Sequence, residues 1–156
     1  MGEVAEALRK HDMPAERLQL EVTESAVMAD PGRAAEVLGS LSQSGVHISI
    51  DDFGTGYSSL NLLRQLPVGE LKIDGSFVQG MVGDGGEDTA IVRSTSDMAH
   101  NLGLSVVAEG VEDQWTLDVL TNFGCDQAQG YFIARPMPAG DLVTWLSSKD
   151  AGMKPN

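Results

Sequence analysis

Several acidic side chains of this 156-residue chain lie where a short apolar segment ends. The segments favour buried β-strands, and the acids at or near their ends are Glu21, Asp51, Asp52, Asp74 and Glu109. Carboxylates crowded together repel one another and raise one another's pKa, so a cation is the natural compensation. Lys72, on one of these segments, could orient or deprotonate a metal-bound water. The pattern predicts a site that holds divalent metal ions against a phosphate ester.

The segments that carry the acids alternate with helical patterns. Asp30 and Pro31 are typical of a helix start, and Gly45 of a helix end. A second helical pattern ends at Gly103, and a third begins at Asp113 as its cap. The five predicted strands are 18–24, 46–50, 70–74, 104–108 and 129–133. This order predicts a parallel sheet of βα units, in which the acids meet at the carboxyl ends of the strands.

The composition excludes several classes of protein. Asp and Glu total 23 against 10 Lys and Arg, a formal net charge of −13, so the surface repels nucleic acid polymers. The single cysteine, Cys125, excludes an internal disulfide and a thiolate zinc cluster. The sequence holds neither an apolar stretch as long as a membrane span nor a signal peptide. We therefore expect a cytoplasmic protein with no membrane span in this chain.

Each of these residues also has a simpler explanation when it is taken alone. An acid between a strand and a helix is often only a helix cap, as Asp113 is expected to be. Lys72 alone would fit a surface lysine whose stem packs on apolar neighbours, and Tyr131 would fit a core or rim residue. The joint pattern is what favours a functional site.

Five short motifs occur in an order that is similar to a known family. They are EVTES at 21–25, DDFGTGYSSL at 51–60, LKID at 71–74, AEGVE at 108–112 and QGY at 129–131. Together they resemble the EAL family of cyclic di-GMP phosphodiesterases, over nearly the whole chain. The resemblance implies a (β/α)8 barrel that hydrolyses cyclic di-GMP to linear pGpG. It also implies Mg²⁺ or Mn²⁺ as the cofactor, with Ca²⁺ as an inhibitory substitute.

The resemblance further implies roles for the residues that match the family motifs. The ligands of two metal ions would be Glu21, Asp51, Asp52 and Glu109, with Asp51 shared between the ions. The catalytic set would be Lys72, beside the attacking water, with Glu109 and Gln129. Glu24 would stabilise the loop that begins with DDFGTG, and Tyr131 would lie near a guanine of the substrate.

The sequence departs from the family pattern before EVTES. The family has a Glu-Ala-Leu string on an early strand and an Asn on a later strand, and both bind metal. Neither has a counterpart here. Glu6-Ala7-Leu8 spells the same letters, but it lies in a helix-like stretch, so we interpret it as a coincidence. We therefore expect residues 1–150 to form a truncated EAL domain, followed by a loose tail at 151–156. A full barrel takes about 250 residues. The expected fold is thus α/β, a partial TIM-barrel-like EAL fold of about five parallel strands, completed by dimerisation or strand swapping.

Three functions remain open from the sequence. The first is a phosphodiesterase fragment that is weak or inactive alone, because two ligands of a hard-cation site are missing. The second is a degenerate module that binds cyclic di-GMP, or pairs with a relative, without cleaving anything. The third is a barrel that hydrolyses glycosides with two carboxylates, although a lysine beside paired aspartates suits metal-assisted attack by water better.

Overall fold

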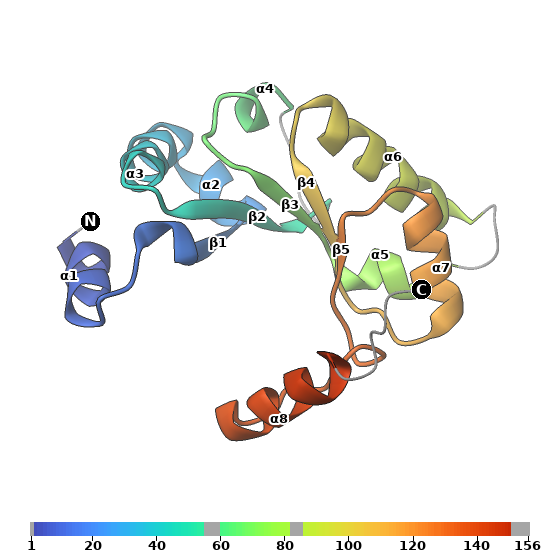
Figure 1. Ribbon diagram of the computed structural model, residues 1–156. Coiled ribbons are helices and arrows are strands. Elements are labelled where there is room, and N and C mark those ends of the chain that lie inside the picture. The colour runs from blue at the N-terminus through green and yellow to red at the C-terminus, as the bar shows by residue number, and fades with distance from the viewer. Residues whose placement is uncertain (1, 55–59, 82–85, 151–156) are drawn as a thin grey trace.

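The computed structural model describes residues 2–54, 60–81 and 86–150, and its centre is one parallel sheet (Figure 1). The strands are β1 (Gln19–Thr23), β2 (His47–Phe53), β3 (Glu70–Ile73), β4 (Ser105–Ala108) and β5 (Gln127–Ala128). They are hydrogen-bonded in the order β1-β2-β3-β4-β5, and all four pairings are parallel. The predicted α/β fold with five parallel strands is confirmed, and within the described residues the sheet does not close into a barrel.

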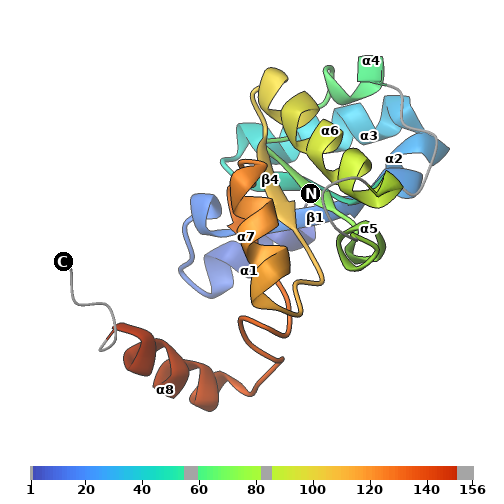
Figure 2. The same cartoon turned by 90° about the vertical axis from the view of Figure 1, so that its right-hand side faces the viewer.

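Helices connect the strands and flank the sheet. They are α1 (Gly2–Lys10), the short 3-10 turn η1 (Ala15–Arg17), α2 (Glu24–Ala29), α3 (Pro31–Gln43), α4 (Leu60–Leu63), α5 (Gly75–Gln79), α6 (Glu87–Asn101), α7 (Gln114–Asn122) and α8 (Ala139–Asp150). Two views show α8 extending away from the sheet (Figures 1 and 2). The stretch Glu6-Ala7-Leu8 lies in α1, as its helix-forming residues predict. The tail at 151–156 lies outside the described residues.

The predicted helix caps are confirmed. The Asp30 carboxylate accepts a hydrogen bond from Arg33 N at 3.0 Å, and Pro31 is the first residue of α3. The Asp113 carboxylate accepts one from Thr116 N at 2.7 Å at the start of α7. Gly45, which follows α3, has a φ of +94°, a conformation that favours glycine. Local residue chemistry therefore decides where these helices begin and end.

Side chains alternate between two different faces of the sheet. Ile48 and Ile50 of β2, and Leu71 and Ile73 of β3, point to the helices and are at most 3% exposed. Each side chain of this kind stabilises the fold by about 1.5–3 kcal/mol when it is fully buried. The residues between them face the opposite side of the sheet, because a strand has a period of two. That opposite face, called the inner face below, is polar and carries the residues of interest.

Two predicted strand boundaries are wrong. Residues 129–133, predicted as the last strand, form a turn instead, in which Ile133 N donates to Gly130 O at 3.0 Å. In this turn Gly130 packs directly on the main chain of Val111, where a Cβ would overlap it. β2 also continues beyond the predicted 46–50 through Asp51, Asp52 and Phe53.

Candidate functional site

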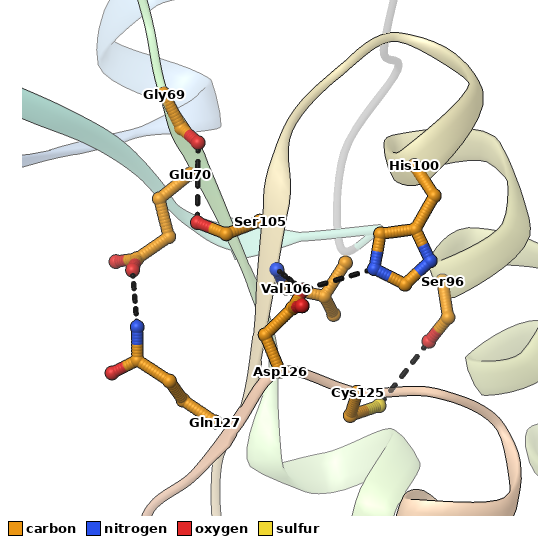
Figure 3. Close-up of polar contacts among 9 residues, drawn as sticks. All are labelled: Gly69, Glu70, Ser96, His100, Ser105, Val106, Cys125, Asp126 and Gln127. Atoms are coloured by element: carbon orange, nitrogen blue, oxygen red, sulfur yellow. Dashed lines mark hydrogen bonds and ion pairs between the residues drawn. The ribbon is translucent and has the colours of Figure 1, made fainter.

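On the inner face, a row of hydrogen-bonded polar side chains precedes the carboxyl ends of the strands. Glu70 is 9% exposed, and its carboxylate accepts a hydrogen bond from the side-chain amide of Gln127 at 3.1 Å (Figure 3). The same carboxylate accepts a hydrogen bond from the side-chain amide of Gln19. Gln19 also donates to Ser49 Oγ at 3.2 Å. The row therefore spans β1, β2, β3 and β5. Glu70 lies two residues before Lys72 on β3, so the two side chains are on the same face of the sheet.

Lys72 lies at the centre of a cluster of carboxylates from three segments. Its Nζ is 2.7 Å from Glu109 Oε1, 2.8 Å from Glu21 Oε2 and 3.1 Å from Asp51 Oδ1. Glu21 comes from β1, Asp51 from β2 and Glu109 from the residue after β4. The structure thus brings together four of the predicted site residues, which we call the lysine cluster. Its lysine side chain is 6% exposed.

The lysine cluster keeps its ammonium group charged. Burial alone would lower the pKa of Lys72, but contacts with Glu109, Glu21 and Asp51 outweigh it, so the pKa lies above its ordinary value. In this arrangement Lys72 donates to the three carboxylates and neutralises part of their charge.

Asp52 reaches a second group of acids through a bulge in β2. The pairing between β2 and β3 shifts register between Ile50 and Phe53, and Asp52 has a φ of +54°. Such a φ is uncommon for a residue with a side chain and often occurs at functional sites. Burial raises the pKa of Asp52, and so do the nearby Asp51 and Asp74 carboxylates.

Asp74, one of the predicted strand-end acids, lies at the start of α5. It caps α5 by accepting a hydrogen bond from Ser76 N at 2.9 Å, and its carboxyl group lies near that of Asp52. In the sequence, Asp74 belongs to the LKID motif and lies two residues after Lys72. The structure places its carboxyl group beside that of Asp52, so we include Asp74 in the candidate site.

Glu24 is the first residue of α2 and connects it to the segment after β2. Its side chain is 5% exposed, and Glu24 Oε2 accepts a hydrogen bond from Gly54 N at 3.1 Å. Within the described ranges, Oε1 of the same residue has no hydrogen-bond partner. Residues 55–59 of the DDFGTGYSSL motif lie outside those ranges. The contact with Gly54 is the geometry that a loop-stabilising role requires.

The remaining two predicted site residues follow β5. Gln129 N donates to Ala108 O at 2.8 Å, and Gln129 O accepts from Val111 N at 3.1 Å. Its main chain therefore lies beside Glu109. Tyr131 is 54% exposed, and its ring is 4.5 Å from the guanidinium carbon of Arg135. Tyr131 lies on the surface, and the contact given for its ring is with Arg135, outside the lysine cluster.

The donor atoms of the lysine cluster suit a hard divalent cation. Carboxylate oxygens are the ligands that Mg²⁺, Mn²⁺ and Ca²⁺ prefer. Asp51 Oδ1 is buried and makes no well-aligned hydrogen bond, although it lies at ion-pair distance from Lys72. Among the described residues, no three His, Cys, Asp or Glu side chains are arranged to hold a metal ion as they stand. The carboxylate ligands therefore fit a metal site. In this structure the Lys72 ammonium group lies among their oxygens.

The fold and the site together define a class of protein. Proteins of this class have a parallel sheet of βα units with acids and one lysine at the strand ends. A family model described as "EAL domain" matches residues 1–136. The chain therefore belongs to the EAL domain family. No helix in the described part of the chain is both long enough and apolar enough to cross a membrane.

Known proteins of the family resemble this chain in sequence and in structure. The bifunctional diguanylate cyclase/cyclic di-GMP phosphodiesterase MucR of Pseudomonas aeruginosa is 46% identical over 140 residues, which is 90% of this chain and 20% of the relative. A solved structure named "PaMucR Phosphodiesterase, c-di-GMP complex" superposes with a TM-score of 0.86 at 46% identity, and the match covers 89% of this chain and 56% of that one.

A further solved structure contains metal. It is Klebsiella pneumoniae BlrP1 in a manganese and cyclic di-GMP complex, with a TM-score of 0.77 at 33% identity, covering 86% of this chain and 34% of that one. A calcium complex of the same protein matches equally well. The chain spans about a fifth of the length of the curated relatives that it matches.

Proposed function

We propose that the lysine cluster, with Asp52, binds a divalent metal ion and the phosphate of cyclic di-GMP. The observation that carries this proposal is the convergence of Glu21, Asp51 and Glu109 on the Lys72 ammonium group. Family membership supports the choice of ligand, since related structures hold cyclic di-GMP together with manganese or calcium. The family reaction is hydrolysis of cyclic di-GMP to linear pGpG.

The residues of this chain would divide the work as follows. Mg²⁺ or Mn²⁺, held by Glu21, Asp51, Asp52 and Glu109, would supply Lewis-acid polarisation of the phosphate and an activated water. Lys72, kept charged by its neighbours, would orient a water or donate to a phosphate oxygen. Gln129 would add a hydrogen bond beside Glu109. Glu24 would hold the segment at Gly54, and Tyr131 would lie near a guanine.

Turnover by this chain alone is proposed to be weak or absent. Two metal ligands that the family motif includes before EVTES have no counterpart here. A hard-cation site with fewer ligands binds more weakly and positions the attacking water poorly, and small displacements lower the rate strongly. A binding module for cyclic di-GMP that does not cleave is therefore the second proposal. The glycosidase alternative fits less well, because a lysine beside paired aspartates suits metal-assisted attack by water better.

Two assays separate these proposals. Calorimetry with cyclic di-GMP in Ca²⁺ should detect binding by the unaltered chain and none by Asp51→Asn. Chromatography of cyclic di-GMP incubated with the chain in Mn²⁺ or Mg²⁺ should show little or no pGpG, and Ca²⁺ should suppress any turnover. Rapid production of pGpG would overturn the expectation of weak activity. Absence of binding in Ca²⁺ would overturn the proposed function.

The site variants need a control for folding. Asp30→Ala removes the cap of α3, which is not part of the lysine cluster, and costs about 1 kcal/mol of stability. We expect this variant to bind cyclic di-GMP like the unaltered chain. Lys72→Ala should lower the affinity for the ligand, because it removes the only cation in the cluster.

A further inference from the structure

β5 is a strand of two residues, and the residue before it strengthens its attachment to β4. Asp126 N donates to Val106 O at 3.1 Å. The Asp126 carboxylate in turn accepts a hydrogen bond from Val106 N at 2.8 Å (Figure 3). Main chain and side chain of one residue thus bind both polar groups of Val106. The carboxylate takes the place that a strand carbonyl would otherwise occupy in the ladder.

Helix α6 contacts the same carboxylate from outside the sheet. His100 Nε2 lies 2.9 Å from Asp126 Oδ2, the oxygen that also accepts from Val106. Val106 is fully buried, so its N–H would be left without a partner if this oxygen moved away. A buried donor without a partner costs about 1–3 kcal/mol. The contact therefore joins α6, β4 and the start of β5 through one oxygen atom.

The chain beyond β5 leads directly to the candidate site. Gln129 lies three residues after Asp126, and its N–H donates to Ala108 O at 2.8 Å. Gln129 O then accepts from Val111 N, across the segment that contains Glu109. β5 is therefore held at its start by Asp126 and at its end by the main chain of Gln129. A shift at the first attachment moves the second.

We propose that Asp126, held by His100, is a positioning residue that sets the register of β5 on β4 and so places Gln129 beside Glu109. The effect of Asp126 on ligand binding rests on the proposed function, in which Gln129 supports the site. The effect of Asp126 on the position of Gln129 is independent of that function. The two effects are therefore measured in separate experiments.

Amide hydrogen exchange of the full chain tests the placement. In Asp126→Ala, exchange at Gln129 N and Val111 N should rise roughly tenfold, because both bonds depend on the position of β5. Glu109 N donates to Ile73 O of β3, so its exchange should stay unchanged. Asp126→Asn should restore protection, since its amide oxygen still accepts from Val106. Asp30→Ala should change none of the three amides.

His100→Ala keeps the bond to Val106 and removes only the contact from α6. It should raise exchange at the same two amides by a smaller factor, and it gives a second measurement if Asp126→Ala does not fold. The proposal is overturned if exchange at Gln129 and Val111 is unchanged in these variants. It is equally overturned if exchange rises by the same factor at Glu109, because that result shows a general loss of stability.

Calorimetry with cyclic di-GMP in Ca²⁺ tests the functional consequence. Affinity should fall roughly tenfold in Asp126→Ala, and it should recover in Asp126→Asn. Unchanged affinity together with increased exchange would overturn the link between Gln129 and the ligand. If the unaltered chain does not bind cyclic di-GMP, the proposed function fails, and the exchange experiment still decides whether Asp126 positions Gln129.

Discussion

At the scale of single residues, Lys72 balances the charge of the strand ends. Three carboxylates contact its ammonium group within 3.1 Å, and the lysine side chain is 6% exposed. Glu21 is about half exposed, whereas Asp51 and Glu109 are mostly covered. Water therefore screens only part of the repulsion among the acids, and the lysine or a divalent cation must compensate the rest.

Lys72→Met should destabilise the fold because it leaves these carboxylates uncompensated. We expect a loss of about 2 kcal/mol, less than the 3–5 kcal/mol for a broken, fully buried ion pair, because the acids are partly exposed. Urea unfolding measures the loss, and added Ca²⁺ should recover part of it. Lys10→Met, in exposed α1, should have no effect. Equal stability of the two variants would show that the cluster does not depend on its lysine.

Asp126 should make the stability of the protein depend on acid pH. The hydrogen bond with His100, and then that with Val106 N, lower the pKa of Asp126 below its ordinary value, although burial opposes this shift. The ionised carboxylate therefore stabilises the folded state above the unfolded-state pKa of about 4. That contribution is lost as the pH falls through the folded-state pKa.

Urea unfolding between neutral and acid pH measures this contribution. Asp126→Asn should be less stable than the unaltered chain at neutral pH, and the difference should shrink as the pH falls below about 4. A difference that stays constant over this range would show that the charge of Asp126 does not stabilise the fold.

At the scale of elements, the turn after β5 depends on a close approach of two segments. Gly130 packs on the main chain of Val111, and a Cβ at position 130 would lie 2.7 Å from the carbonyl carbon of Val111. The backbone itself blocks a side chain there, so no rotamer change can relieve the overlap. This contact holds the residues after β5 against the segment that follows β4.

Gly130→Ala should therefore destabilise the protein by more than about 1 kcal/mol. Gly39→Ala is the matched control: Gly39 lies within α3 with no atom within 4 Å of an added Cβ. The control should be more stable by about 0.5–1 kcal/mol, since alanine favours helices over glycine. Urea unfolding of both variants gives the comparison, and effects of the same sign would contradict the packing at Val111.

The elements that the sequence predicted correctly are those with local signals. Asp30 and Asp113 cap their helices through atoms three residues away, so the pattern alone suffices. The turn at 129–133 escaped prediction because its aromatic residues favour a strand, while its shape depends on Val111, distant in sequence. The bulge at Asp52 likewise requires the pairing with β3. Strand-end acids and family motifs predicted all four residues of the lysine cluster and named Asp74 as a strand-end acid, but not its closeness to Asp52.

At the scale of the whole molecule, the sheet formed by the described residues has two edges, and no other strand in that part of the chain covers its inner face. β1 and β5 each pair with one neighbour within the described residues. Apolar side chains of α8 are exposed as well, namely Leu142, Val143 and Leu146. Open strand edges and exposed apolar patches favour association with another chain.

We expect this chain to form a homodimer or a strand-swapped oligomer. Pairing at an edge would satisfy the free main-chain groups of β1 or β5. Size-exclusion chromatography with light scattering over a dilution series measures the mass. A stable monomer at micromolar concentration counts against this expectation.

The order of the strands has a consequence for how the chain folds as it is made. Each strand from β2 to β5 pairs with the strand that precedes it in the chain. During synthesis, each of β2 to β5 would therefore emerge next to a strand that is already present. Growth of the sheet runs in the direction of translation. β5, the shortest of the five described strands and the last of them in the chain, would complete the surroundings of Glu109 after β1 to β4.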